Sequence, residues 1–159
     1  MRIGHGYDVH KFDKKRKFIL GGVNIEHYAG LLGHSDADVL VHAIIDSLLG
    51  AASLGDLGNF FPDTDDKLKN ISSLVLLKKT TELLYENKFA IINIDSTIVL
   101  QRPRIKDLIF DMRTNISNTC KINMSQINIK ATTEENLGFT GKEEGVCVHA
   151  VCLLNKIKT

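Results

Sequence analysis

Residues 33–52 read GHSDADVLVHAIIDSLLGAA, a polar start followed by a long apolar run. The apolar periodicity predicts a helix over residues 36–53. Asp38, His42 and Asp46 recur every four residues and therefore stack along one stripe of that helix. Such a stripe is often only the solvated face of an amphipathic helix. Because most other positions are apolar, we favour a stripe that lines a cavity, with His42 as a candidate ligand and with Asp38 and Asp46 behind it to orient the ring.

The start of this helix has two compatible interpretations. Ser35 and Asp38 form the S-x-x-D pattern of a capping box, in which side chains satisfy the first free N–H groups of a helix. The remaining N–H groups and the positive end of the helix dipole favour an anion. We therefore expect a phosphate group beside His34 and Ser35.

Outward from this segment, the periodicity alternates between that of strands and that of helices. Predicted strands cover residues 2–10, 18–25, 90–100, 127–131 and 146–154, and predicted helices cover 71–87 and 105–120. In the strand at 90–100, Ile92, Ile94 and Ile98 share one face. Residues 146–154 are β-rich almost throughout, which suits a strand covered on both faces. The element order predicts an α/β (α+β) fold with a single mixed β-sheet backed by helices.

Size and composition narrow the class of protein. The 159 residues are 43% hydrophobic and 25% charged, which is typical of one globular domain, so we expect one domain over residues 1–159. A net charge of +1 gives no basis for binding nucleic acid. Neither a leader nor a membrane span is indicated, which predicts a cytoplasmic protein. Cys120, Cys147 and Cys152 form no CxxC pair, so we expect buried thiols rather than disulfides.

Candidate metal ligands lie at the start of the chain. Asp8 and His10 are two residues apart on a predicted strand, so their side chains project from the same face. Alone, this pair is more typical of a solvent-facing strand. Together with His42 it forms a set of two histidines and one carboxylate, which suits zinc with an open fourth position or non-haem iron.

Two further polar segments have weaker signals. Residues 55–65, GDLGNFFPDTD, combine turn formers with three carboxylates but lack the spacing of an EF-hand. Residues 131–142, ATTEENLGFTGK, contain T-x-x-E, in which Glu135 could be only a helix cap. The chain has no GxGxxG or GxxxxGK[ST] motif. A bound nucleotide would therefore need another kind of pocket.

Taken together, these segments resemble the 2-C-methyl-D-erythritol 2,4-cyclodiphosphate synthases of the non-mevalonate isoprenoid pathway. The similarity covers essentially the whole chain. The motifs that carry it are GxGYDVH at 4–10, LGGV at 20–23, GHSDADVLxHAxxDxLLGAA at 33–52, GDxGxxFPDTD at 55–65 and KATTxExLGFTGxxEG at 130–145. Any one of them could arise by chance, but the ordered set is specific.

The resemblance implies a reaction and a set of sites. Members of this family convert 4-diphosphocytidyl-2-C-methyl-D-erythritol 2-phosphate to the 2,4-cyclodiphosphate and release CMP. By resemblance, zinc binds to Asp8, His10 and His42. A magnesium or manganese ion binds with the help of Glu135. The implied supporters of the transition state are His34 and Thr133. The implied contacts to the sugar and phosphates are Ser35, Asp56, Leu57, Gly58, Phe61, Pro62, Asp63, Thr64, Asp65, Phe139 and Lys142. The implied contacts to cytidine are Leu100, Gln101, Arg102, Pro103, Arg104, Ile105, Lys106, Ala131, Thr132 and Thr133.

The resemblance also implies a homotrimer whose sites lie between chains. Two residues depart from the usual family pattern. Lys142 stands where arginine is usual and cannot reproduce a bidentate grip on phosphate, and Arg104 stands where lysine is common. Two alternatives from other classes remain at this stage. An iron oxygenase would explain the ligand set but not the phosphate-friendly helix start, and a non-catalytic binding module would need no open metal position.

Overall fold

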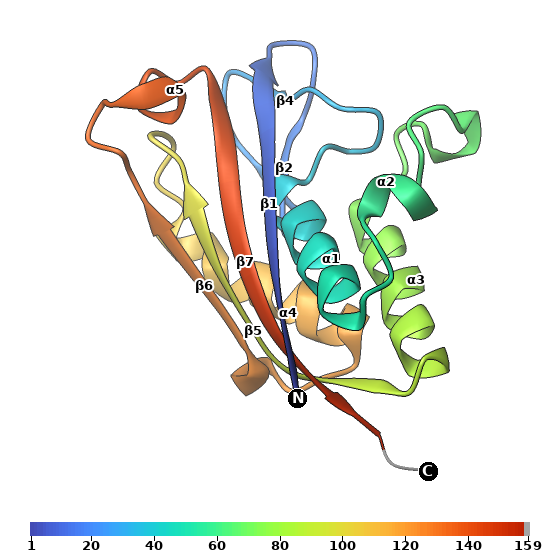
Figure 1. Ribbon diagram of the computed structural model, residues 1–159. Coiled ribbons are helices and arrows are strands. Elements are labelled where there is room, and N and C mark those ends of the chain that lie inside the picture. The colour runs from blue at the N-terminus through green and yellow to red at the C-terminus, as the bar shows by residue number, and fades with distance from the viewer. Residues whose placement is uncertain (158–159) are drawn as a thin grey trace.

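The computed structural model describes residues 1–157 and contains two sheets and five α-helices (Figure 1). The strands are β1 (Arg2–Asp13), β2 (Phe18–Leu20), β3 (Val23–Ile25), β4 (Gly30–Leu31), β5 (Phe89–Val99), β6 (Ile127–Thr132) and β7 (Gly145–Lys156). The helices are α1 (Val39–Ala52), α2 (Leu57–Phe60), α3 (Ser73–Glu86), α4 (Ile109–Cys120) and α5 (Gly138–Gly141), with 3-10 turns η1 (Asp66–Leu68), η2 (Lys106–Leu108) and η3 (Met124–Gln126).

The main sheet has the strand order β4-β1-β7-β5-β6. β5 and β6 run parallel, and the other neighbouring pairs are antiparallel. The helices α1, α3 and α4 lie on one side of this sheet (Figure 1). The predicted mixed sheet backed by helices is therefore confirmed. The predicted extended piece at 18–25 is the hairpin β2–β3, whose turn residues Gly21 and Gly22 both have positive φ, as a tight hairpin turn requires.

Two glycines allow α1 to lie directly on the backbone of β1. A Cβ added at Gly6 would be 2.0 Å from the carbonyl oxygen of Ala43, and one added at Gly4 would be 1.9 Å from that of Ser47. Both distances are far below van der Waals contact. This close approach brings the side chains of α1 within reach of those of β1, which is what a site shared by the two elements needs.

The start of α1 differs from the prediction. The N-cap is Asp38, whose Oδ1 accepts from the Val41 N–H at 3.1 Å, and Ser35 does not cap the helix. The same carboxylate also accepts from the N–H groups of Gly21 and Gly22 at 3.0 and 2.7 Å. The anion at this end of α1 is therefore a side chain of the protein itself. The phosphate expected beside His34 and Ser35 stays a prediction, because Asp38 accepts only from the Val41 N–H of this helix.

A β-bulge overturns the predicted faces of β5. The pairing with β7 shifts between Ile91 and Asn93, so Ile91 faces the core and Ile92 is 40% exposed. The extra residue in the bulge reverses the alternation. Ile94 and Ile98 are buried as predicted.

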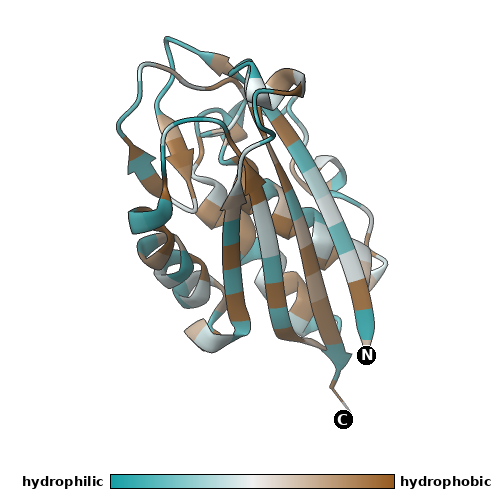
Figure 2. Ribbon diagram, turned by 90° about the vertical axis from the view of Figure 1, so that its left-hand side faces the viewer, coloured by the Kyte–Doolittle hydropathy of each residue, from teal (hydrophilic) through white to brown (hydrophobic). Residues whose placement is uncertain are grey.

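The second face of the main sheet is uncovered in the single chain. Figure 2 looks onto this side, where the strands are crossed by apolar bands and the helices lie behind them. Ile3 is 75% exposed, Tyr7 46% and Val151 43%. The prediction that β7 is covered on both faces therefore does not hold within one chain, because only the face toward the helices is fully packed.

Two other sequence features can be compared with the structure. Cys120, Cys147 and Cys152 are free and buried, as predicted. Among residues 1–157, no helix combines the length and the apolar character that crossing a membrane requires.

Candidate active site

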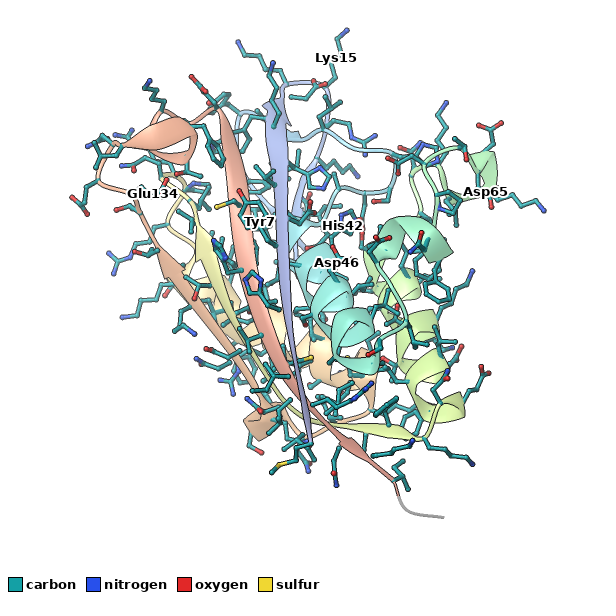
Figure 3. All side chains as sticks on the ribbon, viewed as in Figure 1. Tyr7, Lys15, His42, Asp46, Asp65 and Glu134 are labelled. Atoms are coloured by element: carbon teal, nitrogen blue, oxygen red, sulfur yellow. The ribbon has the colours of Figure 1, made fainter. Side chains whose placement is uncertain are left out.

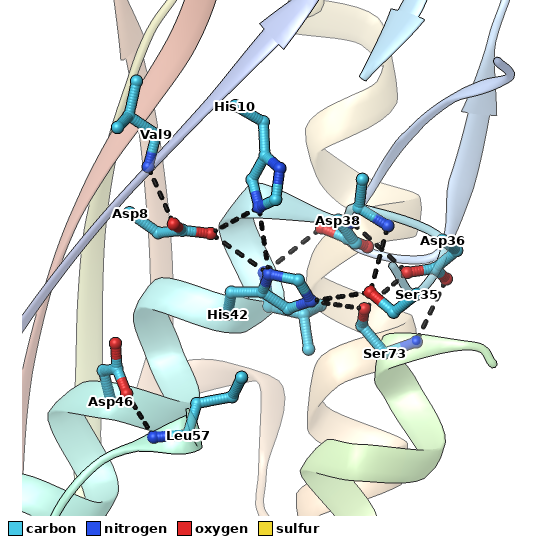
Figure 4. A network of polar contacts seen from close by, with 12 residues as sticks. Asp8, Val9, His10, Ser35, Asp36, Asp38, His42, Asp46, Leu57 and Ser73 are labelled. Carbon is cyan, nitrogen blue, oxygen red and sulfur yellow. Dashed lines mark hydrogen bonds and ion pairs between the residues drawn. The ribbon is translucent and has the colours of Figure 1, made fainter. Parts of the chain in front are cut away.

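Asp8, His10 and His42 converge between β1 and α1, and we call them the triad (Figure 4). Asp8 Oδ2 lies 2.9 Å from His10 Nε2 and 3.1 Å from His42 Nδ1, and the two ring nitrogens are 3.2 Å apart. Asp8 and His10 point to the helix side of β1, as the period of the strand requires. His42 is almost fully buried on α1. The structure thus brings together the three residues that the sequence grouped.

The outer ring nitrogens indicate where the protons lie. His10 Nδ1 is 2.5 Å from the carbonyl oxygen of Leu32, which can only accept, so this nitrogen donates. His42 Nε2 is 2.9 Å from Ser73 Oγ, whose own proton is donated to Asp36 Oδ1, so Nε2 donates as well. In the neutral rings, His10 Nε2 and His42 Nδ1 then carry lone pairs directed at the Asp8 carboxylate. The Asp8 carboxylate and these two ring nitrogens are therefore three acceptors that face one point, and a cation bound there would be stabilised by all three.

The spacing of the triad fits a metal ion. Tetrahedral coordination at the usual zinc–nitrogen length of roughly 2.0–2.1 Å places neighbouring ligand atoms about 3.3 Å apart. The three distances in the triad are 2.9, 3.1 and 3.2 Å. The triad is therefore a candidate metal site with three protein ligands, and its donor set suits zinc among the common divalent ions.

The charge of the triad also favours a cation. Burial disfavours the charged form of Asp8, yet hydrogen bonds to His10 and His42 outweigh burial and hold the pKa of Asp8 well below its usual range. Burial likewise lowers the pKa of His10, but the hydrogen bond and charge of Asp8 overcome it and leave that pKa raised. Proton and metal thus compete for the same position.

The two other acidic residues of the α1 stripe do not contact the His42 ring. Asp38 accepts from the hairpin and from α1, and burial raises its pKa to about 6 against the effect of the Gly22, Gly21 and Val41 N–H groups. Asp46 Oδ1 accepts from the Leu57 N–H at 2.8 Å and so positions the start of α2. The ring is held by Ser35 and Ser73 instead, which corrects the orienting role predicted for Asp38 and Asp46.

A cavity of about 180 Å³ lies beside the triad. Besides the triad, its lining comprises Gly33, His34, Ser35, Leu57, Phe61, Asp63, Leu68 and Leu76. Ser35 Oγ accepts from the Ala37 N–H and lies 3.1 Å from His42 Nε2, so its own proton is free for a ligand. His34 Nε2 donates to the carbonyl of Asp65 at 3.0 Å and ties the 55–65 loop to the start of α1. The predicted substrate residues Asp56, Gly58, Pro62, Thr64 and Asp65 belong to this loop but are not among the lining residues.

A second, larger cavity of about 520 Å³ follows the ends of β5 and β6. Its lining is Leu100, Gln101, Arg102, Pro103, Arg104, Ile105, Lys106, Ile109, Ala131, Thr132 and Thr133. All residues predicted to contact cytidine thus surround one cavity, together with Ile109. The Arg102–Pro103 peptide bond in this lining is cis.

The segment after β6 is exposed. Thr133 Oγ1 donates to Glu135 Oε1 at 3.0 Å, so these two predicted site residues contact each other. Glu135 has a positive φ of 52° and lies in a turn, so it is not the helix cap that its spacing suggested. Phe139 lies on α5, and Lys142 directly follows that helix.

The two cavities lie on different parts of the sheet. In the sheet register, Val9 and Val99 both pair with Cys147, so the triad and the second cavity are at the same height along the strands. They are separated across the sheet. The triad is next to β1, the second cavity is at the ends of β5 and β6, and β7 lies between β1 and β5. At roughly 4.8 Å per strand this amounts to about 10–15 Å. In Figure 3, His42 and Glu134 accordingly lie on opposite sides of β1 and β7.

Sequence reasoning missed the pair Asp36 and Ser73. Ser73 is fully buried, and its hydroxyl contacts both the His42 ring and the Asp36 carboxylate. In the sequence, Ser72 and Ser73 precede an apolar run and look like ordinary helix-start residues. No local signal distinguishes such a serine from a cap.

Known proteins are similar to this chain over nearly its whole length. The YgbB family pattern matches residues 1–155. The 2-C-methyl-D-erythritol 2,4-cyclodiphosphate synthase of Clostridium novyi (strain NT) is 60% identical over 156 residues, which cover 98% of this chain and 99% of that protein. The corresponding synthase of Clostridium acetobutylicum is 58% identical over 154 residues, 97% of this chain and 99% of that protein.

Solved structures are similar over nearly the whole chain. The bifunctional IspDF of Campylobacter jejuni is 44% identical with a TM-score of 0.95, covering 99% of this chain but only 42% of the longer protein. The CDP complex of IspF from Plasmodium falciparum is 35% identical with a TM-score of 0.86, covering 99% of this chain and 97% of that one.

A mixed sheet backed by helices, a candidate metal triad and a match over residues 1–155 define the class: the chain belongs to the YgbB family. Its activity is that of a 2-C-methyl-D-erythritol 2,4-cyclodiphosphate synthase of the non-mevalonate isoprenoid pathway. The enzyme closes 4-diphosphocytidyl-2-C-methyl-D-erythritol 2-phosphate into the 2,4-cyclodiphosphate and releases CMP. The iron oxygenase and the non-catalytic module are thereby set aside.

Proposed function

We propose that this cyclisation takes place at a composite site, built from the triad of one chain and the cytidine cavity of a neighbouring chain in a homotrimer. One observation carries the proposal. Within one chain, the candidate metal site and the cavity predicted for cytidine are separated by β7, although the substrate has to occupy both. A second copy could bring the missing half to each site. The uncovered face of the sheet supports such an assembly, because exposed apolar patches mark interaction surfaces.

The proposed cofactors are zinc at Asp8, His10 and His42, and magnesium or manganese near Glu135. The donor set and spacing of the triad support the first. The carboxylate of Glu135, exposed beside the cytidine cavity, supports the second. When bound, the ions neutralise the charge that gathers on the phosphates during transfer.

The residues of the chain bind and orient the substrate for an internal attack. An oxygen of the 2-phosphate attacks the β-phosphorus, the bond from this phosphorus to the oxygen bridging the α-phosphorus breaks, and CMP leaves with that oxygen. No protein nucleophile is needed, so holding the substrate folded is the main task, which contributes up to roughly 7–11 kcal/mol in well-oriented reactions. We assign Ser35 to donate its free proton to a phosphate oxygen and His34 to hold the 55–65 loop over the sugar. Thr133, with Glu135, would contact the diphosphate from the cytidine side.

The remaining assignments stay as the sequence predicted them. The cavity-lining residues Leu57, Phe61 and Asp63 are proposed to contact the sugar, with the rest of the 55–65 loop. Phe139 and Lys142 are proposed to contact substrate from the other chain. A single catalytic domain over residues 1–159 is likewise a proposal, which relatives of the same length support. A cytoplasmic location is also proposed.

Complementation between two inactive variants tests the composite site. His42→Ala removes a triad ligand, and Glu135→Ala removes the carboxylate proposed to act from the other chain. Each variant alone should be nearly inactive but folded. Unfolded and refolded together, they should form mixed trimers in which some interfaces combine two intact halves, and CMP release should partly recover. Mixed trimers that form but stay as inactive as their parents would contradict the composite site and leave the reaction itself unaffected.

A further inference from the structure

We propose that Asp36 and Ser73 are positioning residues that fix the proton of His42 on Nε2 and thereby set the affinity of the triad for its metal. The inference deepens the proposed function, because it concerns the metal centre assigned there. It names a role for two residues that are not metal ligands themselves. The observation behind it is the chain of contacts that runs from the triad through Ser73 to Asp36 (Figure 4).

Two carboxylates compete for the single proton of the neutral His42 ring. Asp8 Oδ2 is 3.1 Å from Nδ1 and would accept the proton if it were there. Asp36 acts at the other nitrogen through Ser73, because its Oδ1 takes the Ser73 hydroxyl proton and leaves the serine oxygen as an acceptor for Nε2–H at 2.9 Å. Only the second arrangement leaves a lone pair on Nδ1 for a metal.

The other hydroxyl at Nε2 does not settle the tautomer. Ser35 Oγ is 3.1 Å from Nε2 and accepts from the Ala37 N–H, but no carboxylate among residues 1–157 takes its proton. Ser35 can therefore either donate to Nε2 or accept from it. Ser73 has only the accepting role, because its proton is already donated to Asp36. The direction of the hydrogen-bond chain is thus set by Ser73.

The backbone holds this chain of contacts in place. Ser73 is the first residue of α3 and is fully buried, and its N–H donates to Asp36 Oδ2 at 3.0 Å. The Asp36 N–H in turn donates to the carbonyl of Ile71 at 2.9 Å. Asn70 N–H donates to the carbonyl of His34 at 2.8 Å. These contacts dock the start of α3 on residues 34–36, with the Ser73 hydroxyl between the His42 ring and the Asp36 carboxylate.

The test compares two buried serines. Ser73→Ala removes the one hydroxyl that is committed to accepting from Nε2 among the residues that the structure describes. Ser47→Ala removes a fully buried hydroxyl on α1 that donates to the carbonyl of Ile44, away from the triad. The ring nitrogens of His42 are followed by ¹⁵N NMR in metal-free protein under alkaline conditions, where the imidazoles are neutral. Zinc affinity is measured by competition with a chelator.

We expect His42 to be protonated on Nε2 in the wild type and in Ser47→Ala. In Ser73→Ala the proton should move substantially to Nδ1, and zinc should bind about 10–100-fold more weakly, the usual cost of losing a contact to a metal-bound histidine. An unchanged tautomer and an unchanged affinity in Ser73→Ala would overturn the proposal. Equal losses of zinc affinity in Ser73→Ala and Ser47→Ala would also overturn it, because they would reflect a general loss of core packing rather than the contact to His42.

Asp36→Ala provides the second variant if Ser73→Ala does not fold. Alanine removes both acceptor oxygens, so the Ser73 hydroxyl loses the partner that takes its proton and becomes able to donate to His42 Nε2, and the same shift of the His42 proton is expected. A wild-type tautomer in Asp36→Ala would contradict the role of Asp36. Wild-type protein that binds no zinc would contradict the proposed metal centre instead, whatever the tautomer.

Discussion

At the scale of single residues, His42 contributes the one ligand of the triad that comes from a helix. Purified protein should carry about one zinc per chain, as expected for three protein ligands and an open position. His42→Ala should lose that zinc, because the two remaining ligands on β1 leave the ion with half of its usual set. Elemental analysis after gel filtration measures the content.

His27→Ala is the matched control for this change. His27 lies outside the triad, in the loop before β4, where its Nδ1 is hydrogen-bonded to the carbonyl of Ala29. Removing the His27 side chain should therefore not alter the zinc content. Full retention of zinc by His42→Ala would remove His42 from the ligand set.

The residues of the triad could be predicted from the sequence, but their support could not. Asp8 and His10 share a strand face, and His42 belongs to a periodic stripe, so simple spacing finds all three. Their supporting residue Ser73 lies 31 positions from His42 and reaches it only because α3 docks on residues 34–36. Spacing along one helix suggested Asp46 instead, which in the structure accepts from the start of α2.

At the scale of elements, the contact between α1 and β1 depends on glycine. Gly6→Ala would place a Cβ 2.0 Å from the Ala43 carbonyl oxygen, so α1 has to move outward. We expect a loss of stability of about 1–3 kcal/mol, typical of overpacking, together with weaker zinc binding, because His42 moves with α1. Thermal unfolding and chelator competition measure the two effects.

Gly50→Ala is the control on the same helix. A Cβ there meets nothing within 4 Å, so alanine should stabilise α1 by roughly 0.5–1 kcal/mol through its better helix propensity. Zinc binding should stay unchanged. If Gly6→Ala behaved like Gly50→Ala, the close approach would not matter to the site.

The types and order of the long elements could be read from periodicity, whereas their fine register could not. Each predicted long strand and helix is present, with ends shifted by a few residues. The bulge at Ile92 could not be predicted from the sequence, because an isoleucine at this position fits the alternation of an unbroken strand. The short helices α2 and α5 lie in Gly-rich segments that composition describes only as loops.

At the scale of the whole molecule, the uncovered sheet face should control assembly. Tyr7 on this face and Tyr85 on α3 are 46% and 48% exposed in the single chain. Tyr7→Lys should prevent the proposed trimer from forming and reduce CMP release, because a charge would be buried between copies. Tyr85→Lys should leave both unchanged. Light scattering and the activity assay compare them, and a trimeric, active Tyr7→Lys would contradict the role of this face.

The triad takes two ligands from a strand and one from a helix, so a bound ion would also be a cross-link between the two layers of the molecule. Folding and metal uptake are then thermodynamically linked. For an ion that binds only the folded chain, each tenfold rise in free metal above the dissociation constant adds about 1.4 kcal/mol to the free energy of unfolding. The melting temperature should therefore climb with the logarithm of free zinc and drop on chelation. His42→Ala should melt at one temperature at every zinc concentration, and a parallel climb in that variant would place the stabilising ion elsewhere.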